Sequence, residues 1–118
     1  MSPPDRNTLQ IRTESDGPSG TVWLAGELDL SCAGQLDTAI AELCAGGARR
    51  IVLELGELEF MDSTGLRSVL VSDELCKVSD CELLIGRTSR QVERLFQVSG
   101  VAKRLPRRAD TDADAERA

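Results

Sequence analysis

The stretch IVLELGELEFMDSTGL, residues 51–66, passes from a strand pattern to a helix pattern within a few residues. Its first five residues are mostly apolar, β-branched at the start and too few for a helix, which indicates a strand buried on both faces. Gly56 then permits a bend, and Leu66, Val69 and Leu70 recur at helical spacing. A strand followed directly by a helix is therefore expected here.

Asp62 and Ser63 lie where this helix is predicted to begin. Unpaired backbone N–H groups and the positive end of the helix dipole face outward at such a position, and a short side chain with an oxygen is favoured as a cap. On spacing alone, one of the two residues caps the helix and neither has a further role. The alternative is that the Ser63 hydroxyl stands exposed at the turn, where another molecule can act on it.

Length and composition favour a single domain that does not bind nucleic acid. A chain of 118 residues, 41% of them hydrophobic, can form one core but is too short for two domains to be expected. The formal net charge of -6 argues against binding to a phosphate backbone, which needs clustered lysine and arginine. No apolar run approaches the roughly 20 residues that span a bilayer, and the N-terminus has no leader pattern, so we expect a soluble, unsecreted, cytoplasmic protein without membrane contact.

The cysteines form no recognisable metal or redox motif. Cys32, Cys44, Cys76 and Cys81 have no CxxC spacing, and the chain has no histidine to complete a mixed zinc site. We therefore expect reduced, mostly buried thiols, with no metal and no cofactor.

The N-terminal half predicts a hairpin followed by a β-α-β unit. Residues 8–13 and 21–25 alternate apolar and polar side chains, and the turn-rich residues 14–20 between them favour an antiparallel pair. A helix is expected from near Ser31 to the glycines at 46–47, with a stripe formed by Leu36, Ala39, Ile40, Leu43 and Cys44. Because the strand at residue 51 follows this helix, the strands on either side of it are expected to be parallel.

The C-terminal half predicts two further helices and one more strand. The helix that begins near Ser63 has a second apolar side, which we expect to be partly exposed. That side consists of Val71, Leu75 and Val78. Residues 81–85 predict a strand, and Thr88 with Gln91 fits a capping box for a third helix that ends at Gly100. Residues 101–106 are consistent with a short edge strand.

The commonest catalytic arrangements are excluded by residues that the chain lacks. Without histidine there is no Ser-His-Asp or Cys-His arrangement and no histidine general base. Ser63 has no GxSxG or forward SxxK context, and the sequence contains no GxxxxGK[ST] phosphate loop. Nearby carboxylates could pair as acid and base, but loop carboxylates are usually just solvated, so no intrinsic catalysis is expected.

Four segments resemble the STAS domain of the anti-sigma factor antagonist family. They are GELDL at 26–30, IVLEL at 51–55, LEFMDSTGLRSVL at 58–70 and RLFQVSGV at 94–101. The similarity extends from Leu9 to Val101, and a DSTGL element after a GELD turn is specific for that family. The resemblance implies an α/β fold with a mixed four- or five-stranded sheet, helices packed mainly on one face, and a regulatory protein that is not an enzyme.

The resemblance also implies a phosphorylation switch at Ser63. In such antagonists the serine after the aspartate of this motif is phosphorylated by the binding partner, a serine kinase that is also an anti-sigma factor. The matching residues here are Ser63, with Asp62, Thr64 and Gly65 beside it, and Glu27 and Asp29 of the GELD element on the same rim. Unphosphorylated protein is expected to bind the kinase and free the sigma factor for transcription. Phosphorylated protein is expected to dissociate until a PP2C-type phosphatase resets it.

Two alternatives to this switch remain open at this point. The chain could be a non-switching STAS scaffold or interaction module, stressosome-like or transporter-associated, in which Ser63 is only a helix cap. Thr64 stands where many members have a second serine and could be another acceptor. The expected organisation is a flexible N-terminus at residues 1–7, the STAS domain at 8–106 and a disordered polar tail at 107–118.

Overall fold

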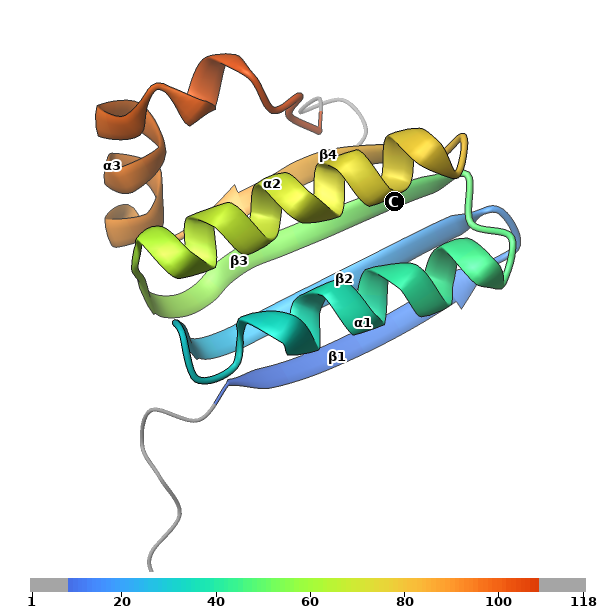
Figure 1. Cartoon of the computed structure of the whole chain (residues 1–118), viewed down its shortest axis with the longest axis horizontal. Coiled ribbons are helices and arrows are strands. Elements are labelled where there is room, and N and C mark those ends of the chain that lie inside the picture. The colour runs from blue at the N-terminus through green and yellow to red at the C-terminus, as the bar shows by residue number, and fades with distance from the viewer. Residues whose placement is uncertain (1–8, 109–118) are drawn as a thin grey trace, which may run out of the picture.

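The computed structural model describes residues 9–108, which form a four-stranded mixed sheet with helices packed against it (Figure 1). In order across the sheet, the strands are β1 (Gln10–Asp16), β2 (Ser19–Leu28), β3 (Arg50–Met61) and β4 (Glu82–Thr88). β1 is antiparallel to β2, whereas β2, β3 and β4 are parallel. The predicted α/β fold, hairpin and β-α-β unit are confirmed.

Two helices lie side by side over one face of the sheet, and a third lies at one end (Figure 1). The helices are α1 (Ala33–Ala45), α2 (Ser63–Val78) and α3 (Arg90–Ser99), and a short 3-10 helix, η1 (Val101–Lys103), follows α3. α1 covers β1 and β2, α2 covers β3 and β4, and α3 stands near the start of α2. None of the described helices is long and apolar enough to cross a membrane.

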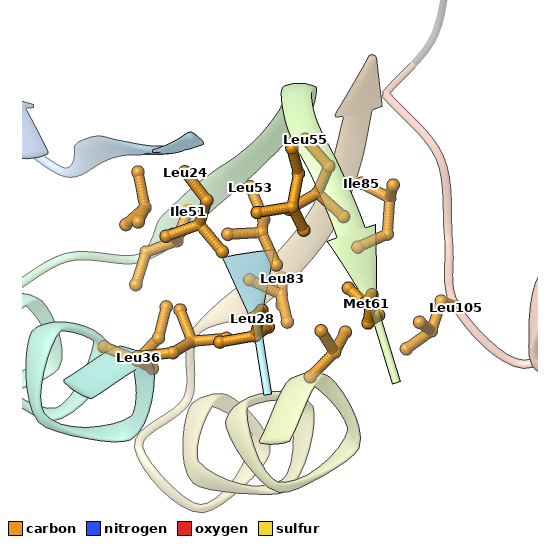
Figure 2. Packing of buried hydrophobic residues seen from close by; sticks show 14 of the residues in the cluster. Leu24, Leu28, Leu36, Ile51, Leu53, Leu55, Met61, Leu83, Ile85 and Leu105 are labelled. Atoms are coloured by element: carbon orange, nitrogen blue, oxygen red, sulfur yellow. The ribbon is translucent and has the colours of Figure 1, made fainter. Parts of the chain in front are cut away.

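The core fills the space between the sheet and the helices with aliphatic side chains (Figure 2). Leu24, Ile51 and Leu53 point from the sheet toward the side on which Leu36 of α1 lies, and all four are almost fully buried. Ile85 of β4 is equally buried and lies on the far side of the core, near Leu105. On the opposite face of β3, Val52 is also buried, at 5% exposure. The prediction of a strand buried on both faces is therefore confirmed at its centre.

The strands are longer than their sequence patterns predicted. The turn of the hairpin is only Gly17 and Pro18, because Ser15 and Asp16 still pair with β2. β2 continues through the GELD element to Leu28, and β3 passes Gly56 and reaches Met61. The expected bend occurs inside β3 instead: two register shifts against β2 each leave one extra residue on β3, as β-bulges do.

α2 presents two different sides, as expected. Its buried side is built mainly from small residues and faces α1, and the Ser68 hydroxyl donates a hydrogen bond to Oδ1 of Asp37 across the helix pair at 2.9 Å. On the second side Val71 is 38% exposed and Val78 85% exposed, whereas Leu75 is half-buried. Partial exposure of this side is therefore confirmed.

Two predictions near α3 are wrong. Thr88 is not the cap, because it ends β4; Ser89 is the N-cap, and its hydroxyl accepts a hydrogen bond from the Val92 N–H. Residues 101–106 are not a strand, because Val101 and Leu105 are spaced like one helical turn and are both buried. The backbone returns to β4 only afterwards, in a bridge between Ile85 and Arg107.

The folded part of the chain reaches at least to Arg108. Arg107 forms an ion pair with Glu93 at 2.8 Å, and Arg108 forms a largely buried ion pair with Glu54 at 3.0 Å. The sequence predicts that the disordered tail begins at residue 107, and this boundary is wrong by at least two residues. The expectations for residues 1–7 and for the rest of the tail lie outside the described residues.

Candidate functional site

Ser63 is the first residue of α2 and is exposed. Parallel strands place their carboxyl ends at the same edge of a sheet, and β2 and β3 both end at the edge where α1 and α2 begin (Figure 1). The two connections therefore form a common rim. This rim brings the GELD element and the DSTG element together, as the family resemblance implied.

Asp62, and not Ser63, caps α2. Oδ1 of Asp62 accepts a hydrogen bond from the Gly65 N–H at 2.8 Å, and the Asp62 backbone is extended, as an N-cap requires. The Ser63 hydroxyl has no hydrogen-bond partner among residues 9–108. The helix start is thus completed by the aspartate, and the serine oxygen is left free toward solvent.

Thr64 and Gly65 turn inward from the rim. Thr64 is half-buried and Gly65 is buried. A Cβ atom on Gly65 would clash with the carbonyl oxygen of Leu28 and would lie 2.9 Å from Cγ of Met61. Close packing of α2 against the end of β2 therefore explains this glycine.

Asp29 lies on the same rim as Asp62. Oδ1 of Asp29 accepts hydrogen bonds from the Ser31 hydroxyl at 2.7 Å and the Ser31 N–H at 3.0 Å, which lower the pKa of the Asp29 carboxyl. Asp29 and Asp62 line one shallow depression together with Leu30 and Ser31. An ionised carboxylate and the helix cap thus border the exposed start of α2.

Glu27 is set back from this depression. It lies within β2, where it pairs with Phe60 of β3, and it is half-buried. Leu30, by contrast, is 79% exposed and borders the depression, although the sequence reasoning did not select it. An exposed apolar residue in a polar loop is a signal that could have identified it.

A sequence profile described as "Mlab, STAS domain" matches residues 11–107, most of the described chain. The chain belongs to the STAS domain family. The anti-sigma-B factor antagonist of Staphylococcus aureus is 30% identical over 93 residues, which cover 79% of this chain and 86% of that protein. This relative is named as an antagonist of the anti-sigma-B factor.

Solved structures share the fold of this STAS domain. An anti-sigma factor antagonist from Mycobacterium paratuberculosis superimposes with a TM-score of 0.78 at 22% identity, covering all of both chains. SpoIIAA in its unphosphorylated form superimposes with a TM-score of 0.72 at 22% identity, covering 92% of this chain and 95% of that one. The phosphorylated form of SpoIIAA, described as a Bacillus cell fate determinant, superimposes with a TM-score of 0.66 at 21% identity, covering 94% of this chain and 100% of that one.

Gln91 holds the end of β3 in this STAS domain, a role that the sequence reasoning missed. Its side-chain oxygen accepts a hydrogen bond from the Met61 N–H at 2.9 Å, and its side-chain nitrogen donates one to the Met61 carbonyl at 3.1 Å. α3 thereby fixes the backbone directly before Asp62. The capping-box pattern had assigned Gln91 a different bond, and no other feature of the sequence indicates this pairing.

Proposed function

We propose that this STAS domain is an anti-sigma factor antagonist that works by partner switching. In its unphosphorylated form it binds an anti-sigma factor serine kinase in the cytoplasm, and the sigma factor is free to direct transcription. Phosphorylation of Ser63 by the kinase separates the two proteins, and a PP2C-type phosphatase restores the binding form. The domain itself is not an enzyme and needs no cofactor.

The observation that carries this proposal is the division of roles at the start of α2. Asp62 satisfies the helix N-terminus at 2.8 Å, so the adjacent Ser63 hydroxyl has no structural bond to lose when it is modified. A cap serine would be shielded by its own hydrogen bond, whereas an exposed hydroxyl at a protruding helix start can enter the active site of another protein. The relatives named as antagonists, one of them solved in both phosphorylation states, support this assignment.

A phosphate on Ser63 would change the charge of the rim without unfolding it. It adds about -1.5 to -2 charge, which the positive end of a helix tolerates. The same charge would lie next to Asp62 and on the rim that carries Asp29. Like charges brought together in a protein interface cost several kcal/mol, and about 3 kcal/mol weakens binding about a hundredfold.

The proposed contact surface follows the rim of the two loops. It consists of Glu27, Asp29, Asp62, Ser63, Thr64 and Gly65, with Glu27 and Gly65 contributing mainly through the backbone they support. Leu30 adds an exposed apolar side chain beside the depression. A partner with a complementary apolar pocket next to its catalytic site would fit this arrangement.

Phosphate mapping with the partner kinase tests the proposal. The kinase is isolated as the protein that co-purifies with the Ser63→Ala chain from the source cell, and is then incubated with ATP and the wild-type chain. Intact mass should show one added phosphate, mapped to Ser63 and absent from Ser63→Ala. Thr64→Ala removes the other candidate acceptor and should still gain one phosphate at Ser63. Ser15→Ala, near the hairpin turn and away from the rim, is the matched control and should be labelled like wild type. Labelling at Thr64, or no labelling, contradicts the proposal, and the second result favours a non-switching scaffold.

A further inference from the structure

Three of the four cysteines meet at the end of the molecule opposite Ser63. The sulfur atoms of Cys44, Cys76 and Cys81 all lie within 4.8 Å of one another. Cys76 and Cys81 are buried, and Cys44 is half-buried. The residues come from the last turn of α1, the last turn of α2 and the position directly before β4, so the spacing in sequence gives no sign of the cluster.

The backbone around the cluster holds the three thiols in place. The Cys76 carbonyl accepts hydrogen bonds from the Ser79 N–H at 3.0 Å and the Cys81 N–H at 2.8 Å, which close a tight turn between the two cysteines. Asp80 adopts a left-handed conformation in that turn, with φ of 55°. The Cys44 carbonyl accepts a hydrogen bond from the Gly47 N–H at 3.1 Å, where α1 ends. The arrangement is thus preorganised by three separate elements.

The surroundings of the cluster favour a cation. α1 ends one residue after Cys44 and α2 ends two residues after Cys76, so both helices direct the negative end of their dipoles to this region. The half-buried Cys44 leaves a path from solvent. An anion or a neutral polar ligand would find only weak S–H donors in a group of three thiols.

The ligand type selects the kind of cation. Sulfur is a soft ligand that prefers zinc(II), copper(I) and similar ions, whereas magnesium and calcium require oxygen. With a metal–sulfur bond of about 2.3 Å, three sulfurs in a trigonal arrangement lie about 4.0 Å apart. The present separations are at most 4.8 Å, so small side-chain adjustments would bring all three sulfurs into the bonding range.

We propose that Cys44, Cys76 and Cys81 form a binding site for one thiophilic d10 metal ion, zinc(II) or copper(I). The three thiols bind as thiolates and release their protons to the solvent, with no change in the oxidation state of sulfur or metal. Copper(I) is complete with three sulfur ligands, whereas zinc(II) takes a water molecule as a fourth ligand on the Cys44 side. The bound ion joins the C-terminal ends of α1 and α2 to the start of β4.

The experiment titrates the reduced, metal-free full chain with zinc(II) and, under anaerobic conditions, with copper(I). Affinity is measured by competition with a chromophoric chelator, and stoichiometry by native mass spectrometry. Cobalt(II) replaces zinc(II) to show thiolate-to-metal absorption. Cys32→Ser is the matched control, because Cys32 is buried at the other end of α1 and outside the cluster.

The proposal expects one ion per chain, thiolate absorption with cobalt(II), and unchanged affinity in Cys32→Ser. Cys44→Ser should bind at least about a hundredfold more weakly, since even changes outside the ligand set weaken metal sites about 10- to 100-fold. Cys81→Ser is the second variant, and far-UV circular dichroism shows which variants are folded. Failure of wild type to bind either ion, or equal binding by the folded Cys44→Ser or Cys81→Ser chain, overturns the proposal.

Discussion

Asp62 and Ser63 are neighbours in the chain, yet the structure gives them separate roles. Both are ordinary N-cap residues, so local pattern alone could place the helix start but could not assign the cap. The hydrogen bond from the Gly65 N–H to Oδ1 of Asp62 shows that Asp62 is the cap. Because Asp62 takes this bond, Ser63 is not needed as the cap, and a free Ser63 hydroxyl could therefore be suggested by the sequence but not established.

Removal of the cap should weaken the fold. Asp62→Ala deletes the acceptor of the Gly65 N–H, and we expect a loss of about 1 kcal/mol in the free energy of unfolding. Asp62→Asn keeps an acceptor oxygen and should change the free energy of unfolding by only about 0.3 kcal/mol. Urea denaturation measures both. An Asp62→Ala chain as stable as wild type would mean that Ser63 can take over the cap.

Gly65 and Gly34 provide a matched pair for the packing argument. Gly65→Ala places a methyl group against the Leu28 carbonyl and the Met61 side chain, so we expect a loss of about 1–3 kcal/mol. Gly34 lies near the start of α1 with nothing within 4 Å of its added Cβ, and Gly34→Ala should stabilise by up to about 1 kcal/mol. Thermal and urea unfolding give both values. Equal effects of the two substitutions would contradict the close packing of α2 on β2.

At the scale of elements, the periodicity of apolar residues predicted a helix or strand correctly where burial alone determines its sequence pattern. The buried β3 and the apolar stripe of α1 were predicted because burial alone sets their patterns. The bulges between β2 and β3 were not predicted, because they depend on strand pairing. The cap of α3 was placed one residue too early, because pairing of Thr88 with Leu55 extends β4 and leaves Ser89 as the N-cap. The link from Gln91 to Met61 joins residues far apart in sequence, and a local pattern cannot show it.

Glu93 joins three elements through a single carboxylate. It accepts hydrogen bonds from Gln97 at 3.0 Å, from the Thr88 hydroxyl at 2.7 Å and from Arg107 at 2.8 Å. These hydrogen bonds, with Gln97 the largest contributor, lower the pKa of Glu93 to about 2. The charged form is therefore favoured in the folded state relative to the unfolded chain.

This pKa predicts a pH dependence of stability. Because the folded pKa lies below the ordinary value of 4.5, the stabilisation is present above pH 4.5 and is lost as the pH falls toward about 2. Glu93→Gln should be less stable than wild type at neutral pH, and the difference should shrink across that window. Glu14→Gln, on the exposed face of β1, is the control and should show no such trend. A constant difference between Glu93→Gln and wild type across the window would refute the assignment.

At the scale of the whole molecule, α2 connects two chemically different ends. Ser63 begins the helix and Cys76 lies near its end, about 20 Å away at 1.5 Å per residue. The sequence predicted the first end, because its polar residues follow a recognisable strand-to-helix turn. It did not predict the second, because three cysteines from separate elements meet only in the folded chain.

At the scale of the whole molecule, a charge-based switch requires that the fold stays intact when the rim becomes more acidic. An acidic group at a helix N-terminus is favourable by about 0.3–1 kcal/mol, which offsets repulsion from Asp62 and Asp29. The thermal midpoint of Ser63→Asp should therefore remain close to that of wild type. Ser15→Asp adds the same charge near the hairpin turn, at the other end of β2, and is the matched control.

The most direct measurement is calorimetric titration of the partner kinase with wild-type, Ser63→Ala, Ser63→Asp and Ser15→Asp chains. We expect Ser63→Ala and Ser15→Asp to bind the kinase like wild type, whereas folded Ser63→Asp should bind it about a hundredfold more weakly. Wild-type affinity in the folded Ser63→Asp chain would contradict a switch based on charge at the start of α2.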